Sequence, residues 1–200
     1  TSRAERRAAK EKGKYAEIKK ATYTPSQLKT IEEQVLSEKP RGAEPRYWED
    51  INIGDELAPV VKGPLNMTDM IAFYAGTLGG AALNRGGAHV FGLRYQRRHE
   101  AWSYVDPETG VREKPEMVHA QDSMAADIGI PIAYDLGCQR VSWLGHLLTN
   151  WMGDDGFLRK LYVEIRRFNM LGDTTWCKGR VTRKYLEGDQ HLAECQVLCE

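Results

Sequence analysis

The stretch CQRVSWLGHLLTNWM, residues 138–152, carries apolar side chains at helical spacing. Leu144, Leu148 and Trp151 recur three or four residues apart, and Leu147 widens the same face. A helix with so broad an apolar face is expected to be buried against other elements of the fold. The stretch therefore predicts a long central helix, around which the rest of the chain is organised.

Alternating apolar and charged side chains follow this helix and predict an antiparallel meander. The predicted strands lie within LRKLYVEIRRF at 158–168, DTTWCKGRVTRKY at 173–185 and HLAECQVLC at 191–199, with a turn at EGDQ, residues 187–190. A further strand is predicted near residues 55–61. One long helix followed by such a meander favours an α+β fold, with an antiparallel sheet wrapped around the helix.

The amino-terminal part of the chain differs in character. Residues 1–21 are rich in Lys and Arg and hold little apolar surface, so we expect a solvated basic linker. Thr24, Pro25 and Gln27 then match the signature of a capping box. They predict a short helix that ends before Pro40.

These patterns divide the chain into a basic linker with a short helix, residues 1–43, and a domain at 44–200. Within the domain, TDMIAFYAG at 68–76 predicts a brief helix capped by Thr68. Residues 76–118 contain many glycines and arginines without clear periodicity. We expect a long irregular insertion there, with short helices at most.

Composition limits the classes of function. The 200 residues are 42% hydrophobic and 28% charged, as in ordinary globular proteins, and their formal net charge is zero. No overall field attracts nucleic acid or a membrane surface, and no apolar run approaches the roughly 20 residues that span a bilayer. The chain is therefore predicted to have neither partner.

The cysteines indicate the redox environment. Cys138, Cys177, Cys195 and Cys199 form no CxxC pair and have no metal-ligand spacing. We therefore predict free thiols, a cytoplasmic location and no bound metal.

The stretch HAQDSMAADIGIPIAYDLG, residues 119–137, holds the main candidates for chemistry. The ordinary pKa of histidine suits His119 to proton transfer near neutral pH. Gly137 precedes the central helix, where a glycine lets a ligand oxygen approach a backbone N–H. The structural alternatives are that His119 merely opens a short helix at 120–127 and that Gly137 only serves the turn into the long helix.

The spacing within this stretch resembles a known family. The matching positions are His119, Ala125, Gly129, Pro131 and Gly137. In this order they resemble the MaoC-like, or (R)-specific enoyl-CoA hydratase, family of the hot-dog superfamily. RYWEDINIGDELAP at 46–59 resembles the opening strand of that family, and the meander resembles its return strands. The resemblance covers about residues 44–200, interrupted by the insertion.

The resemblance implies a hot-dog fold and a lyase of fatty acid metabolism. Its reaction would be the reversible addition of water to a trans-2-enoyl-CoA, or the dehydration of a 3-hydroxyacyl-CoA. Coenzyme A would enter as part of the substrate, and no separate cofactor is expected. Hot-dog domains pair through their sheets, so the resemblance also implies a homodimer or an upstream or partner hot-dog domain. An upstream domain of this kind would make the chain the carboxyl-terminal half of a double hot-dog protein.

The family's acid–base pair is incomplete in this sequence. The family places an Asp five positions before its His, and Lys114 stands there relative to His119. We rank Asp135 first as the replacement because it lies close to Gly137 in the sequence, with Tyr134 as a second hydroxyl donor. The structural alternatives are a helix cap for Asp135 and a half-buried aromatic role for Tyr134.

Other candidates for substrate binding are weaker. Glu116 lies three residues before His119, whereas Asp122 is in position to cap the short helix. Arg94 and Arg140 could meet the phosphates of coenzyme A, although arginines are common on surfaces. His146, within the long helix, is interpreted as a satisfied, partly buried histidine.

Three functions remain open from the sequence. The first is the hydratase or dehydratase. The second is a non-catalytic hot-dog module that binds acyl-CoA or completes the site of a partner domain, which Lys114 favours. The third is an acyl-CoA thioesterase on the same fold, which the His–Gly–Pro–Gly spacing disfavours.

Overall fold

The computed structural model describes residues 15–77, 90–100, 103–106 and 109–200. The chain forms two compact units, each assembled from three separate stretches. The first unit comprises Thr1–Ala21, Leu65–Leu136 and Phe168–Asp173, and the second comprises Thr22–Pro64, Gly137–Arg167 and Thr174–Glu200.

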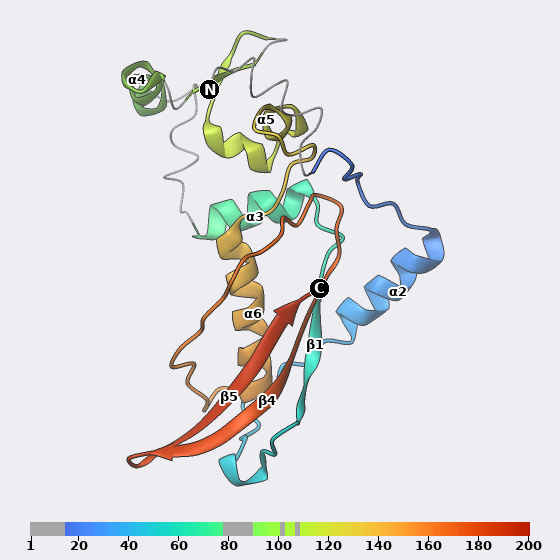
Figure 1. The fold of residues 1–200 in the computed structure, drawn as a ribbon, viewed down its shortest axis with the longest axis vertical. Helices are drawn as coiled ribbons and strands as arrows, with labels where there is room; N and C mark the ends of the chain where they lie inside the picture. Colours follow the sequence, from blue (N-terminus) through green and yellow to red (C-terminus); the bar gives the residue numbers. More distant parts are fainter. Residues whose placement is uncertain (1–14, 78–89, 101–102, 107–108) are drawn as a thin grey trace. The chain divides into compact units, whose positions relative to one another are not determined.

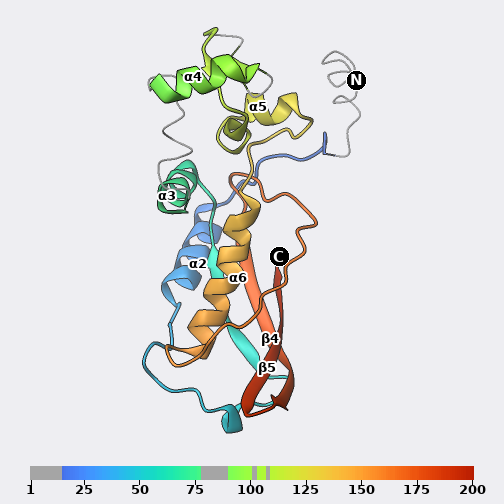
Figure 2. The same ribbon diagram turned by 90° about the vertical axis from the view of Figure 1, so that its left-hand side faces the viewer.

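The second unit is built from a three-stranded antiparallel sheet and a long helix. Strands β1 (Glu56–Lys62), β4 (Thr175–Glu187) and β5 (Gln190–Cys199) pair in the order β1-β4-β5. Helix α6 (Gly137–Met152) runs alongside these strands (Figure 1, Figure 2). The predicted long helix, these three strands and the α+β class are confirmed.

The core of the second unit lies between α6 and the sheet. Leu144 and Leu147 from the helix pack with Val60, Cys177 and Val181 from the strands. Their apolar surface is removed from water, which is the main term that holds a helix on a sheet. The apolar face that the sequence predicted for α6 is therefore the face that builds this core.

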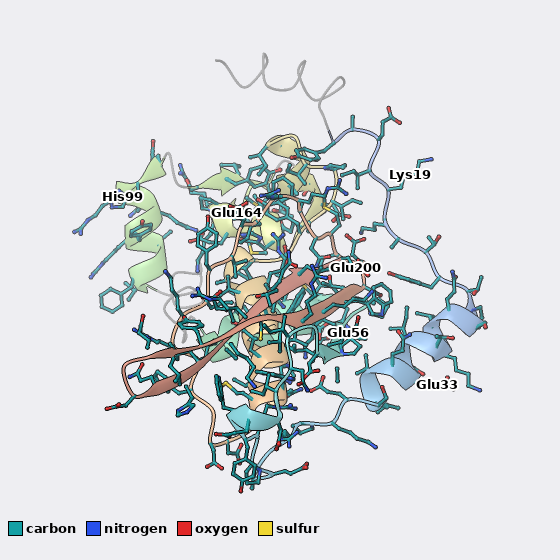
Figure 3. All side chains as sticks on the ribbon, turned by 60° about the horizontal axis from the view of Figure 1, so that its bottom comes forward. Lys19, Glu33, Glu56, His99, Glu164 and Glu200 are labelled. Carbon is teal, nitrogen blue, oxygen red and sulfur yellow. The ribbon has the colours of Figure 1, made fainter. Side chains whose placement is uncertain are left out.

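The predicted strand at 158–168 is wrong. The segment of residues 158–167, which contains the Glu164 labelled in Figure 3, is irregular and not part of a sheet. Leu158, Leu161 and Val163 do pack against the core of the second unit. The alternating pattern therefore predicted correctly which side chains of this segment are buried. Within the described chain, however, no neighbouring strand forms a hydrogen-bonded ladder with this backbone, and a strand requires one.

The amino-terminal helix α2 (Pro25–Leu36) belongs to the second unit. Its capping box is present as predicted. The Thr24 side chain accepts a hydrogen bond from the N–H of Gln27, and the Gln27 side chain accepts one from the N–H of Thr24. Ile31 is the buried residue of this helix, and the helix packs beside β1. A short 3-10 helix, η1 (Trp48–Asp50), precedes β1.

A polar cluster joins three segments of the second unit. Nε2 of His146 lies 2.7 Å from a carboxylate oxygen of Glu38, and Nδ1 lies 2.8 Å from the ammonium nitrogen of Lys62. The Asn150 side chain donates a further hydrogen bond of 2.9 Å to Glu38. The expectation of a satisfied, partly buried histidine at position 146 is therefore confirmed.

The first unit contains mostly short helices. They are α3 (Met67–Thr77), α4 (Val90–Arg98), the 3-10 helix η4 (Pro115–His119) and α5 (Asp122–Asp127). A two-residue pair, β2 (Tyr104–Val105) with β3 (Arg112–Glu113), lies between α4 and η4. Short helices in the predicted insertion are therefore confirmed where the structure describes it, and residues 78–89 lie outside the described residues.

The predicted cap of α3 is two residues off. Thr68 lies inside the helix, and Asn66 takes the capping role. The Asn66 side chain accepts a hydrogen bond of 3.1 Å from the N–H of Asp69, whose carboxylate accepts one of 3.0 Å from the N–H of Asn66. The amide oxygen of asparagine caps as well as a threonine hydroxyl, so the signal was ambiguous by two residues.

A small core holds the first unit together. Ala125, Ile130, Ile132 and Met170 are buried in one cluster, with Phe168 packed against them. The chain leaves this unit after residue 136 and returns to it at 168. The returning segment is therefore an integral part of this core, although it lies far away in sequence.

The described residues offer neither a membrane-spanning helix nor a metal-binding cluster. Every helix among them is too short or too polar to span a bilayer. No three or more His, Cys, Asp or Glu side chains gather there in an arrangement that could hold a metal ion.

Candidate active site

His119 lies at the end of η4, and its ring faces a backbone carbonyl. The Nδ1 atom is 2.9 Å from the carbonyl oxygen of Tyr134. A carbonyl oxygen can only accept a hydrogen bond, so Nδ1 must carry the proton and donate it. In the neutral ring the lone pair is then on Nε2. The contact thus fixes both the tautomer and the orientation of the imidazole.

The carbonyl of Tyr134 is held in place by a short antiparallel bridge. Tyr134 pairs with Met170, the N–H of Asp135 donates to the carbonyl of Asn169, and the N–H of Leu171 donates to that of Ala133. Each of these two hydrogen bonds is 2.8 Å long. The returning segment therefore positions the acceptor for His119.

Aromatic rings pack against the histidine. The rings of His119 and Tyr134 meet edge to face with centroids 4.7 Å apart, and those of Tyr134 and Phe168 do so at 4.6 Å. Tyr15 extends the row, with its centroid 5.2 Å from that of Phe168. Edge-to-face contacts of this kind restrict ring rotation and exclude water from one side of the imidazole.

Burial is the dominant influence on the pKa of His119. Desolvation lowers this pKa below its ordinary value of 6.5. Hydrogen bonding to the backbone of Tyr134 and Asp135 and the charge of Glu116 oppose this effect without overcoming it. The neutral ring, with its lone pair on Nε2, is therefore the dominant form at neutral pH.

Asp135 follows Tyr134 and is almost completely buried, with 1% of its surface exposed. Burial raises the pKa of the Tyr134 hydroxyl, and the charge of Asp135 raises it further. Tyr134 is therefore a neutral hydroxyl at physiological pH. Tyr134 and Asp135, the two residues that the sequence proposed beside His119, are thus its neighbours. Tyr134 contacts it with its ring and its carbonyl, and Asp135 with its backbone.

Glu116 and Asp122 have different roles in the first unit. The charge of the Glu116 carboxylate acts to raise the pKa of His119, against the larger lowering by burial. Its backbone carbonyl accepts a hydrogen bond of 3.3 Å from the hydroxyl of Tyr74. Asp122 accepts one of 2.9 Å from the N–H of Ala133 and forms an ion pair of 2.6 Å with Lys20.

Asp122 consequently stabilises the loop that leads to Tyr134. Its pKa is lowered, since the bonds from Lys20 and from Ala133 favour the carboxylate more than burial opposes it. The expected helix cap is wrong. Asp122 is the first residue of α5, the cap position is Gln121, and the Asp122 carboxylate bonds across the loop instead.

Three candidates remain, namely Gly137, Arg140 and Arg94. Gly137 is the first residue of α6, in the second unit, and a Cβ atom added there would lie 2.8 Å from Cδ1 of Ile165. This Cδ1 atom is the end of a flexible side chain that is 48% exposed and can move aside, so the contact alone does not require a glycine. Arg140 donates a hydrogen bond to the carbonyl of Arg167, which fixes the chain after α6. Arg94 is exposed on α4 in the first unit.

The structure thus gathers His119, Tyr134, Asp135 and Glu116 within the first unit. Sequence reasoning missed two residues that support them. Phe168 was assigned to the end of a strand, and Lys20 to a solvated linker. Neither carries a local signal, because the contacts to Tyr134 and Asp122 join positions far apart in the chain.

No protein-family model matches this chain, and no curated protein does so either.

Proposed function

We propose that this chain is a hydratase or dehydratase of enoyl thioesters, with His119 as its general base. The observation that carries the proposal is the hydrogen bond from Nδ1 of His119 to the carbonyl of Tyr134. It supports a neutral imidazole that presents Nε2 as a base, and burial keeps the ring in this state at neutral pH.

Each proposed step follows from the needs of the reaction. Nε2 of His119 takes a proton from water while the oxygen attacks C3 of the enoyl thioester. The Tyr134 carbonyl stabilises the imidazolium that forms, because it accepts the hydrogen bond from Nδ1. The imidazolium then gives this proton to C2 of the resulting enolate, which completes the addition of water and restores the neutral ring. In the reverse direction the same groups remove water from a 3-hydroxyacyl thioester.

A hot-dog arrangement and a second hot-dog domain, in a homodimer or on a partner chain, belong to the proposal. The long helix α6 beside an antiparallel sheet supports the first. The proposed substrate is an acyl-CoA, with no separate cofactor, and a cytoplasmic setting suits the free thiols of all four cysteines. Gly137 opens α6 in the other unit and is left out of the proposed acid–base group.

A crotonyl-type thioester of coenzyme A tests the function directly. We expect the absorbance of the conjugated double bond to fall as water adds, in proportion to the amount of protein. Release of free coenzyme A thiol without loss of the double bond would instead identify a thioesterase. Binding of the thioester without either reaction would identify a non-catalytic module and overturn the proposal.

One observation favours the non-catalytic module as a second candidate. Asp135 is 1% exposed, so its carboxyl cannot exchange a proton with substrate while it stays in place. The position at which the resembling family carries its Asp holds Lys114. A module of this kind would bind acyl-CoA through the same histidine without turning it over.

The pH dependence of turnover tests the state of His119. Because the folded-state pKa lies below 6.5, we expect the acid limb of kcat/KM to have its midpoint below pH 6.5. Between the folded-state pKa of His119 and pH 6.5, this ring binds more protons in the unfolded chain than in the folded one. The stabilising contribution of the neutral ring is therefore present above pH 6.5 and lost as the pH falls through the folded-state pKa.

Rate profiles and urea unfolding at a series of pH values measure both effects. The His119→Gln variant is the control for the second, since it should lose this part of the pH dependence of stability. A midpoint above pH 6.5 would mean that an anionic partner outweighs burial, in conflict with the described geometry.

Two carboxylate variants separate the candidates for the acid partner. Glu116→Gln removes the charge that raises the pKa of His119, so the acid limb should move to lower pH. Because the Asp135 carboxyl is buried and cannot exchange a proton with substrate, Asp135→Asn should leave the acid limb in place. Rate profiles of the two variants, measured side by side, distinguish them. An unmoved limb in Glu116→Gln would exclude Glu116 as the partner of the histidine.

A further inference from the structure

Two cysteines face each other across the pairing of β4 and β5. Cys177 and Cys199 occupy directly opposite positions in the antiparallel register. Their Sγ atoms are 3.6 Å apart. Both residues belong to the second unit, whereas the candidate active site belongs to the first.

The backbone around this pair has the geometry that brings side chains closest. The neighbouring residues Trp176 and Glu200 exchange both of their N–H···O=C hydrogen bonds, at 2.8 and 3.1 Å (Glu200 is labelled in Figure 3). Cys177 and Cys199 are therefore a non-hydrogen-bonded pair, in which Cα atoms are typically about 4.5 Å apart. This separation lies within the range of about 4.4–6.8 Å that a disulfide bond spans.

We propose that Cys177 and Cys199 are a dithiol that small-molecule disulfides of the glutathione class oxidise to a cross-strand disulfide. The remaining cysteines do not offer the same geometry. Cys195 lies opposite Val181, and Cys138 is exposed at the start of α6. Cys195 and Cys199 are four residues apart on one strand, roughly 13 Å along it, which is too far for a bond.

Burial determines the order of the chemical steps. Cys177 is completely buried, whereas Cys199 is partly exposed. The hydrogen bond with Cys199, together with burial, raises the pKa of the Cys177 thiol and makes it a poor first nucleophile. Cys199 is therefore the residue that meets the oxidant.

The exchange balances without any further reagent. The Cys199 thiolate attacks one sulfur of the small disulfide, forms a mixed disulfide and releases one thiol. Cys177 loses its proton, attacks Sγ of Cys199 and releases the second thiol. Two protein thiols and one small disulfide thus become one protein disulfide and two small thiols.

The test uses the whole chain, reduced and then equilibrated with mixtures of reduced and oxidised glutathione. Remaining thiols are blocked with N-ethylmaleimide, and the digested chain is mapped by mass spectrometry. We expect one cross-linked peptide pair that joins Cys177 to Cys199, with Cys138 and Cys195 still open to the blocking reagent. Dithiothreitol should reverse the cross-link.

Two variants on the same strand provide the matched comparison. Cys195→Ser should retain the cross-link, and Cys199→Ser should abolish it. If Cys199→Ser does not fold, the map of the unmodified chain alone decides the question. A bridge to Cys138 or Cys195, a lasting glutathione adduct on Cys199 with Cys177 still reduced, or four reduced thiols in every mixture would each overturn the proposal.

Discussion

Replacement of His119 by alanine is expected to lower the turnover of an enoyl thioester by at least about 100-fold, the usual contribution of a general base. The variant loses Nε2, the proposed proton acceptor, and also the hydrogen bond from Nδ1 to the Tyr134 carbonyl. Initial rates under kcat/KM conditions measure the effect. A matching circular dichroism spectrum and an unchanged unfolding midpoint would show that the loss is chemical rather than structural.

His99→Ala is the matched control for this experiment. His99 also lies in the first unit, directly after α4, where it is exposed and packs against the ring of Tyr95. Its replacement should leave turnover unchanged. If the His119 variant keeps its activity, the proposed base is wrong, whatever the chain's overall function.

Leu147→Ala should produce the largest loss of stability among simple substitutions in α6. Leu147 is 0% exposed and packs in the core between this helix and the sheet. Removing its side chain loses apolar burial and leaves a cavity, at a cost of about 2–5 kcal/mol in the free energy of unfolding. Urea unfolding followed by tryptophan fluorescence measures the change.

Tryptophan fluorescence suits this measurement because four of the five tryptophans lie in the second unit: Trp48, Trp143, Trp151 and Trp176. Val141→Ala, in the same helix but at a position that is 37% exposed, is the control and should cost less than about 1 kcal/mol. Equal losses in the two variants would contradict the assignment of the buried face of α6.

Local patterns predicted much of the second unit. Helix α6 and the hairpin of β4 and β5 repeat one pattern over many residues, and the turn at Gly188 allows a positive φ of 60°. The strand predicted at 158–168 failed for a different reason. Its apolar and charged residues do alternate, but a strand also needs a partner strand. The presence of a partner depends on the whole fold and cannot be predicted from the eleven residues of the segment.

The sequence predicted which residues form the candidate site, but not the hydrogen bonds and the ion pair that hold them in place. The sequence placed His119, Tyr134 and Asp135 close together because they share one short stretch. It could not reveal that the histidine bonds to a backbone carbonyl, since any residue supplies a carbonyl and its identity carries no signal. It also could not show that Asp122 binds Lys20 across about a hundred residues of chain.

The segment at 158–167 combines fixed side chains with a backbone outside any ladder. In deuterated water, its amide hydrogens should exchange on the timescale of local fluctuations, whereas those in the middle of β4 wait for the sheet to open. In this part of the chain, side chains are therefore packed although the amide hydrogens of the same residues are poorly protected from exchange. A protection map would show the segment as a gap between two slowly exchanging elements, α6 and β4, although Leu161 and Val163 stay packed on the same core.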